Sequence, residues 1–351
     1  MASRARFDWG SAMRGRRGLL GARRGPVWLG MALVLSTAAP LQAQTSLGSQ
    51  RVGTSAGTFL KIPLDARGTA MGGAIAALVH GPASLFVNPA GLGIENERAL
   101  LLCGVDYITG IPAGGAAVAL PFAPIRGALG FALSGIYSEM DETDEYHPLG
   151  TGRRFSYNVW TATLGASRAL TDKLSFGLAV KAYREGMATE IGGPAATSWL
   201  LDAGAVYFVG YRDARIGIAI NNFGPDLRPA GRFESRRTDA QIRYSSFSPP
   251  TLFRVGFGID PWRSARWATY VSGEIGHVAD NQESFRFGGE VCFDNTLTLR
   301  GGYDAGADAL KMHGGVGLRV GLGRGFAELD YAYSAGGYFG DVQRWSLTLP
   351  W

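Results

Sequence analysis

Strict alternation of apolar residues with polar or small ones recurs along this chain, and this two-residue period constrains the fold more than any other feature. In LFRVGFGI (252–259) a large apolar side chain falls on every second residue, with Arg254 and two glycines between them. RIGIAIN (215–221) and the C-terminal WSLTLPW (345–351) show the same pattern. A period of two indicates β-strands whose two faces meet different surroundings, so the sequence predicts an all-β fold.

Fourteen segments fit as strands, most of them longer than the usual strands of globular proteins and close to the length that a tilted membrane-spanning strand needs. Aromatic residues such as Trp267, Tyr331 and Trp345 gather near strand ends, which is typical of the interfacial girdles of a membrane barrel. The predicted strands are 99–108, 113–123, 127–139, 155–169, 173–185, 198–211, 214–223, 251–260, 266–277, 284–293, 296–305, 311–321, 325–334 and 342–351.

The connections between these strands alternate in length. Those such as PIR (124–126) and DN (294–295) are short, whereas the third, fifth and seventh are long and polar, and the longest spans 224–250. Short turns on one side and long loops on the other predict a transmembrane antiparallel β-barrel of about 14 strands in the bacterial outer membrane, with both termini in the periplasm. The last strand should pair with the first, because lipid offers no hydrogen bonds to an open sheet edge. A periplasmic sandwich or propeller is the alternative.

Residues 1–43 have the composition of a secretory signal peptide. They hold seven arginines and one acid, and their apolar stretch ends in small residues before a cleavage point after Ala43. The pairs Arg16-Arg17 and Arg23-Arg24 leave a twin-arginine signal as the weaker alternative. The whole chain has 34 bases and 29 acids, and without the leader 27 and 28 remain. The basic charge therefore belongs to the leader, and nothing points to nucleic-acid binding.

Residues 44–98 do not alternate and are rich in glycine and other small residues. We expect them to form a compact N-terminal plug with short helices inside the barrel, because fourteen strands enclose a lumen too wide for side chains alone to fill. LDARGTAM (64–71) and PASLF (82–86) are the expected helices, and Asn88-Pro89 is an expected turn. The expected organisation is a signal peptide at 1–43, a plug at 44–98 and a barrel at 99–351.

Two parts of the mature chain resemble the PorV/PorQ family of outer-membrane proteins. They are residues 53–78 together with SLFVNPAGLG (84–93), and residues 285–306 together with the C-terminal 329–351. More distantly, the plug resembles the hatch of the FadL-type transporters of hydrophobic compounds. The hatch-like motif residues are Gly68, Met71, Gly72, Gly73, Asn88, Pro89, Ala90 and Gly91.

The resemblance implies a non-enzymatic barrel that takes part in protein export, as some family members do by collecting cargo from a type IX secretion translocon. The second hypothesis is a FadL-like channel for hydrophobic small molecules, whose ligand would lie against Phe59, Leu60 and Phe86. The third is a structural barrel without a substrate. The expected partners are outer-membrane lipid, the barrel assembly machinery, and either a translocon with its cargo or a hydrophobic small molecule; no cofactor is expected.

The alternation assigns each strand residue to the inner or the outer face, and it places a set of charged side chains on the inner face. We expect these charges to pair with the plug and with each other. The alternative is that they line a polar path through the lumen. Glu290 and Arg300 lie on neighbouring strands and should face each other. The same phases put Asp106 inside, and Cys103 and Cys292 on opposite faces, which disfavours a disulfide between them. The predicted lumen-facing set is Lys181, Arg254, Arg286, Glu290, Arg300, Asp304, Glu328 and Asp330.

The chain carries no pattern that predicts catalysis or a metal site. It has no Gly-x-Ser-x-Gly and no phosphate loop, and its four histidines and two cysteines lack metal-ligand spacing. The acidic run DETDEYH (141–147) is expected to be a solvated loop, with a cation site as the alternative. The last strand instead resembles the signal by which the assembly machinery recognises its clients, through Trp345, Leu347, Leu349 and Trp351.

Overall fold

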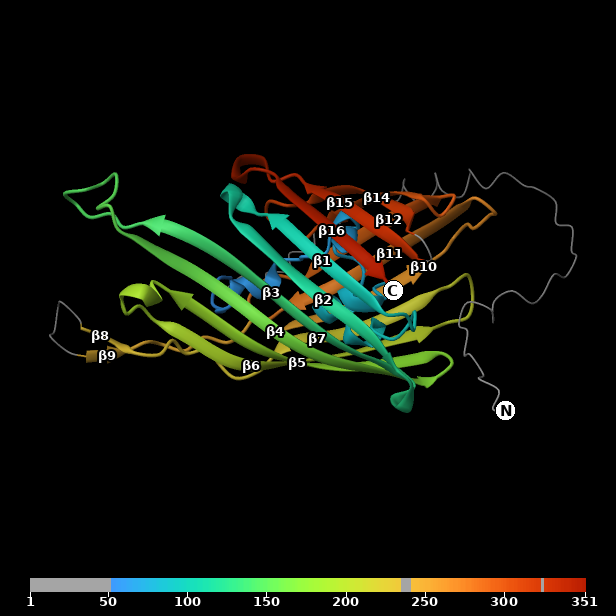
Figure 1. Ribbon diagram of the computed structural model, residues 1–351, viewed down its shortest axis with the longest axis horizontal. Helices are drawn as coiled ribbons and strands as arrows, with labels where there is room; N and C mark the ends of the chain where they lie inside the picture. The colour runs from blue at the N-terminus through green and yellow to red at the C-terminus, as the bar shows by residue number, and fades with distance from the viewer. Residues whose placement is uncertain (1–51, 235–240, 323–324) are drawn as a thin grey trace, which may run out of the picture. The chain divides into compact units, whose positions relative to one another are not determined.

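The computed structural model describes residues 52–234, 241–322 and 325–351, and in these residues fourteen antiparallel strands form a closed barrel (Figure 1). The first strand pairs with the last, so the sheet has no open edge. The predicted closed barrel is therefore confirmed, while the predicted signal peptide lies outside the described residues. The barrel strands are β1 (Ala99–Asp106), β2 (Pro112–Phe122), β3 (Gly127–Asp141), β4 (Arg154–Thr171), β5 (Leu174–Met187), β6 (Ala195–Phe208), β7 (Arg215–Phe223), β10 (Leu252–Ile259), β11 (Trp267–Val278), β12 (Ser284–Phe293), β13 (Leu297–Asp304), β14 (Met312–Leu322), β15 (Gly325–Ser334) and β16 (Val342–Pro350).

Two features of the sheet were not evident from the sequence. The longest loop, which joins β7 to β10, contains a small two-stranded hairpin of β8 (Arg232–Glu234) and β9 (Gln241–Arg243). Strands β3 to β6 are 14 to 18 residues long and extend beyond the other strands at the end of the barrel that carries the long loops (Figure 1). The wall is therefore taller on this side than on the other.

The alternation in the sequence separates two faces of the barrel wall. The outward residues are large and apolar, as Leu164, Trp199 and Phe287 show, and all three are exposed in the isolated chain. Most inward residues of the same strands are small, polar or charged, with apolar exceptions such as Val159 and Leu200, and most are buried. An apolar outer band of this kind is what a barrel needs in order to contact lipid.

The phase of the first strand was predicted wrongly. Asp106 is exposed on the outer face of β1, and Cys103 faces inward and is buried, as Cys292 also faces the lumen. The sequence of β1, ALLLCGVD, has apolar residues on both faces because its inner face packs against apolar plug residues, including Leu64 and Leu92. A strand that is apolar on both faces gives no phase from its sequence.

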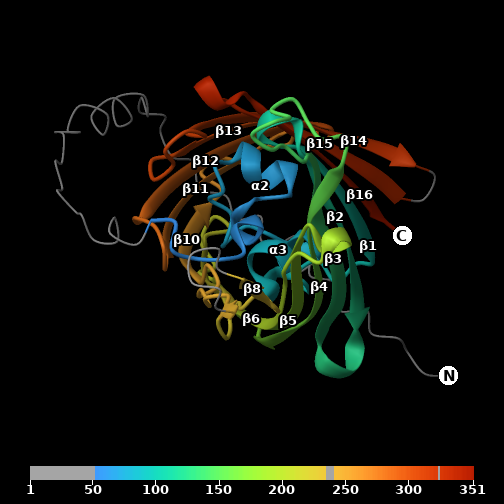
Figure 2. The same cartoon turned by 90° about the vertical axis from the view of Figure 1, so that its left-hand side faces the viewer.

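Residues 52–98 lie within the ring of strands, where Figure 2 shows the short helices α2 and α3. None of the helices in the described residues is long and apolar enough to cross a membrane. The helices of this segment are η2 (Thr58–Lys61), α2 (Ala66–Ala70), η3 (Gly81–Ala83), α3 (Ser84–Val87) and η4 (Pro89–Gly91). Outside it, single 3-10 turns occur in the connections, namely η5 (Ile108–Gly110), η6 (Ala123–Ile125), η7 (Thr189–Ile191) and η8 (Gly337–Phe339).

Inward-facing glycines let the barrel wall approach the backbone of this segment, which we call the plug. A Cβ atom on Gly302 of β13 would lie 2.0 Å from the amide nitrogen of Gly72, and one on Gly217 of β7 would lie 2.3 Å from the carbonyl oxygen of Ala76. A side chain at either position would push the plug away from the wall. A Cβ at Gly177 or Gly288 would also meet plug backbone, and one at Gly130, Gly165, Gly204, Gly258 or Gly315 would meet a plug side chain.

Candidate functional site in the barrel lumen

Helix α2 is fixed to the barrel wall at both of its edges. Asp65 caps it, since its Oδ2 accepts a hydrogen bond from the Gly68 amide at 2.7 Å. The Ala66 amide donates to Ser346 Oγ of β16 at 2.8 Å. On the opposite side, Arg67 Nε lies 3.1 Å from Glu290 Oε2 of β12. These contacts tie one short helix to strands that are far apart in the sequence.

Arg67 joins a chain of alternating charges on β12 to β15. Glu290 lies between Arg67 and Arg300, and the Arg300 Nε to Glu290 Oε2 distance is 2.6 Å. Arg300, whose side chain is only 2% exposed, also pairs with Asp330 and, at 3.5 Å, with Glu328. Burial of these charges is tolerable because each has partners of opposite sign. The network connects the plug to the wall.

The remaining predicted lumen charges form two further clusters. Glu274 of β11 pairs with Arg254 at 2.8 Å and with Arg286 at 3.3 Å, and Arg286 also pairs with Asp304 at 2.9 Å. Glu274 accepts the Ala76 amide of the plug at 2.9 Å as well. Lys181 pairs with Asp202 at 2.7 Å, beside a β-bulge in β7. The structure thus places all eight predicted residues on the inner face, in contact with acids, bases or the plug.

His80 bridges Arg67 to the end of the plug. Its Nδ1 lies 3.0 Å from Glu95 Oε2, and its Nε2 is in hydrogen-bonding contact with Arg67 Nη1. Because a guanidinium can only donate, Nε2 must accept, which puts the ring proton on Nδ1 facing Glu95. The histidine therefore links two oppositely charged groups that are separated in the sequence.

Two cavities lie at the end of the lumen that carries the short turns. One, of about 60 Å³, lies between the plug and β14 to β16 and is lined by Leu78, Leu92 and Phe326 together with Arg67 and Glu95. The other has a volume of about 270 Å³ and is dominated by charged and polar side chains. Its lining includes Arg67, Arg215, Arg263, Arg300, Arg319, Glu95, Glu290 and Glu328. This half of the lumen is polar, and its charges are internally paired.

An apolar cluster lies in the opposite half of the lumen, beside the charged cluster of Arg254, Glu274, Arg286 and Asp304. Phe59 of the plug is buried in a cluster with Ile136 and Val159 of the wall and with Leu227 of the long β7–β10 loop. This loop crosses the lumen opening, since the Ala56 amide donates to the Ser248 carbonyl at 3.1 Å. Plug, wall and loop therefore close this end together.

The predicted ligand-lining residues Phe59, Leu60 and Phe86 all belong to this apolar cluster, Phe59 as a buried member and the other two as partly buried neighbours. Neither of the two cavities described above is lined by these three residues. Phe86 also contacts a second apolar cluster within the plug, around Met71 and Leu78. In this structure the three residues therefore pack against other side chains.

The Asn-Pro-Ala motif holds two parts of the plug together. Asn88 is fully buried, its Nδ2 donates to the Ala76 carbonyl at 2.8 Å, and its Oδ1 accepts the Ala90 amide at 3.1 Å. Gly204 of β6 leaves the space for this amide, since a Cβ there would lie 2.0 Å from Asn88 Oδ1. Seven of the eight motif residues are buried, and Gly73 is partly exposed. Their contacts are those of an anchor for the plug.

Several residues of the lumen network were missed at the sequence level. Arg67, His80 and Glu95 lie in the plug, which has no periodic pattern. Alternation therefore could not predict which way their side chains point. A lone arginine in the otherwise small and uncharged run ARGTAMGG was the available signal. Arg344 of β16 was also missed; it is 1% exposed and its Nε donates to the Pro63 carbonyl at 2.9 Å.

The acidic run between β3 and β4 is a surface loop held by local contacts. Glu142 pairs with Arg153 at 2.6 Å, and Asp144 contacts His147 at 2.9 Å. No group of three or more histidine, cysteine, aspartate or glutamate side chains in the described part of the chain is placed to hold a metal ion.

The architecture described above matches that of solved outer-membrane barrels. A FadL homologue of Pseudomonas aeruginosa superposes with a TM-score of 0.54 at 13% identity, over 82% of this chain and 98% of that one. The monoaromatic hydrocarbon channel CymD gives 0.55 at 14%, over 82% and 97%, and the toluene transporter TbuX of Ralstonia pickettii gives 0.51 at 15%, over 82% and 96%. No family model and no curated protein matches the sequence.

The fold is therefore that of the FadL-like, 14-stranded outer-membrane β-barrels. Two of these neighbours are described as a monoaromatic hydrocarbon channel and a toluene transporter. None of them supports the narrower expectation of a PorV/PorQ protein.

Proposed function

We propose that this protein is an outer-membrane channel for the uptake of small hydrophobic molecules. The observation that carries the proposal is the apolar cluster at the long-loop end of the plug, where Phe59, Leu60 and Leu227 meet the wall. A channel for polar solutes gains nothing from an apolar lining, whereas a hydrophobic solute leaving water is stabilised by one. The solved hydrocarbon channels of the same fold support this substrate class.

The proposal is tested by comparing two solutes in one host. Cells that make this barrel, in a strain with no other hydrocarbon channel and with a cytoplasmic toluene-oxidising enzyme, should oxidise toluene several-fold faster than cells with an empty vector. Uptake of arabinose should not change. The substitution Phe86→Ser, at the contact of the two apolar clusters, should lower the toluene rate. An increase for arabinose and none for toluene would show a polar pore instead.

We also propose that the C-terminal end of the chain lies on the periplasmic side and that the last strand acts as an assembly signal. Trp345 and Trp351 are exposed on the outer face, and β16 ends at the barrel rim with the short turns. Trp351→Ala should lower the amount of barrel in the outer membrane, measured as the fraction that migrates faster on gels when unheated. Normal assembly of this variant would contradict the signal role.

A part in protein export is the second candidate, and the tall wall of β3 to β6 favours it. The loops at the top of this wall expose Tyr146, Ile191 and Leu149, the last at 98%, as a surface that binds cargo would. The comparisons lend this role no support. Mild crosslinking in the native membrane followed by mass spectrometry would decide: a copurifying translocon or secreted proteins would favour export, and small hydrophobic molecules alone would favour uptake.

A further inference from the structure

The loop between β7 and β10 differs in charge from the other long loops. Residues 224–250 contain five arginines and three acids. By contrast, residues 142–153 contain three acids and one arginine, and residues 188–194 contain one acid and no base. The loop 224–250, which we call the basic arm, is therefore positively charged, whereas the other long loops are acidic. This concentrates positive potential at one place on the rim of the barrel.

The basic arm contains an open groove of about 330 Å³. The groove is lined by Arg228, Pro229, Ala230, Gly231, Arg243 and Tyr244. Arg228 and Arg243 are both exposed. Arg228 donates one long hydrogen bond, at 3.5 Å, to Ser246 Oγ, and its partner is a hydroxyl instead of a carboxylate. Two guanidinium groups thus face one open concavity.

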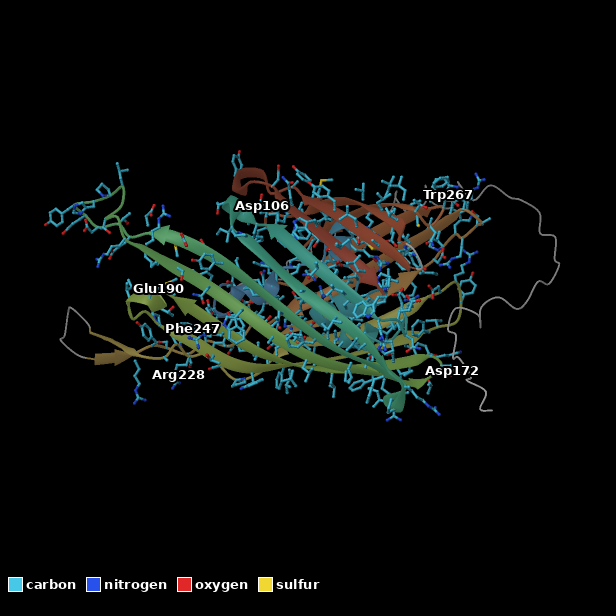
Figure 3. The ribbon with its side chains drawn as sticks, in the orientation of Figure 1. Asp106, Asp172, Glu190, Arg228, Phe247 and Trp267 are labelled. Carbon is cyan, nitrogen blue, oxygen red and sulfur yellow. The ribbon has the colours of Figure 1, made fainter. Side chains whose placement is uncertain are left out.

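The position of this groove relative to the membrane follows from its contact with β6. The Ala230 amide donates to the Ala195 carbonyl at 2.7 Å, at the first residue of β6. Trp199, four residues further along β6, is 65% exposed on the outer face and marks the aromatic girdle. Four residues of strand rise roughly 13 Å, so with the usual tilt the groove lies about 10 Å above the girdle. Figure 3 shows Arg228 and Phe247 at the end of the barrel opposite to Asp172 and Trp267.

We propose that this groove binds the phosphate-bearing headgroup of a glycolipid in the outer leaflet of the membrane. The polar layer of a bilayer extends roughly 5 to 8 Å beyond the hydrocarbon core, so a headgroup that carries sugars reaches the level of the groove. Guanidinium groups bind phosphate through paired hydrogen bonds, and two of them line this groove. The inference is independent of what passes through the barrel.

The test uses the full-length protein in detergent micelles, titrated with diphosphoryl lipid A and followed by native mass spectrometry. The double variant Arg228→Gln/Arg243→Gln should weaken binding roughly tenfold or more, because it removes two charge-assisted contacts. The matched control is Arg153→Gln/Arg154→Gln, whose arginines already pair with Glu142 and Asp141 on the neighbouring loop. The control should bind as the natural protein does. Faster migration of unheated samples shows that each variant is folded.

Three results would overturn the proposal. Equal binding of lipid A by the natural protein and by the groove variant would show that the groove is not the binding site. Equal binding of lipid A with and without its phosphates would show that the protein does not recognise the phosphate. Equally tight binding of the free phosphorylated core oligosaccharide would show that a soluble glycan, and not a membrane lipid, is the ligand. Selective loss in the groove variant, with a requirement for both phosphate and acyl chains, would support the proposal.

Discussion

At the scale of single residues, the lumen is organised by buried charges that satisfy one another. Glu290 illustrates this, because it accepts from Arg67 of the plug and from Arg300 of the wall. One carboxylate thus compensates two buried guanidinium groups. A buried ion pair contributes little net stability compared with apolar residues, but the removal of one partner leaves an uncompensated charge in a poorly solvated place.

We therefore expect Glu290→Gln to lower the free energy of unfolding by about 3 to 5 kcal/mol, because Arg67 and Arg300 would share only the acids on β15. Urea unfolding of the barrel in lipid vesicles, followed by tryptophan fluorescence, measures the change. Glu142→Gln is the matched control, since its partner Arg153 is exposed and the pair is solvated. A variant at Glu290 as stable as this control would mean that water reaches the network.

At the scale of elements, adjacent glycines give β13 two different faces. Gly302 faces inward and touches the plug, whereas a Cβ on Gly301 would meet no atom within 4 Å. The plug residue Gly72 has a φ of +66°, and a Cβ there would lie 2.8 Å from the Tyr303 amide nitrogen. The plug backbone contacts the β13 backbone directly here. A side chain added on either the strand or the plug could therefore not be accommodated by rotation of a neighbouring side chain.

Gly302→Ala should therefore separate the plug from the wall, while Gly301→Ala, one residue away, should not. The expected result is a raised single-channel conductance in planar bilayers for the inward variant and an unchanged closed state for the outward one. Comparable folding yields on gels would show that both barrels form. If Gly302→Ala stays closed, the plug is held by the surrounding ion pairs and not by this contact.

At the scale of the whole molecule, the plug and the β7–β10 loop close the lumen at different levels. The loop covers the apolar cluster through Leu227, and the plug occupies the middle through α2, α3 and the Asn88 anchor. A barrel of fourteen strands without these segments would contain a continuous aqueous channel.

Deletion of residues 54–93 should therefore convert the protein into an open pore. Planar bilayer recordings should show stable ion conductance for the deletion and none for the full chain. Deletion of 228–243 serves as the control, because it removes the loop hairpin and leaves the plug in place. A plug deletion that stays closed would show that the long loop alone seals the barrel.

Particular residues show how much of the fold and of the lumen network could be predicted from the sequence. Strands such as β10 alternate because one face meets lipid and the other the lumen, and so the closed barrel and the inward position of Arg254 and Glu290 followed from spacing alone. The phase of β1 did not, because its inner face meets apolar plug residues and both of its faces are apolar. The hairpin of β8 and β9 was missed because its strands are three residues long.

The sequence by itself determined the class of fold, since contact with lipid on one face and with the lumen on the other imposes a period of two on most of the strands. Only the tertiary structure decided which residues meet in the lumen. Arg67, His80 and Glu95 converge on Glu290 and Arg300 because the plug folds against strands that follow it by some 200 residues. Contacts over such separations depend on where the plug sits in the closed barrel, and no local pattern encodes that position.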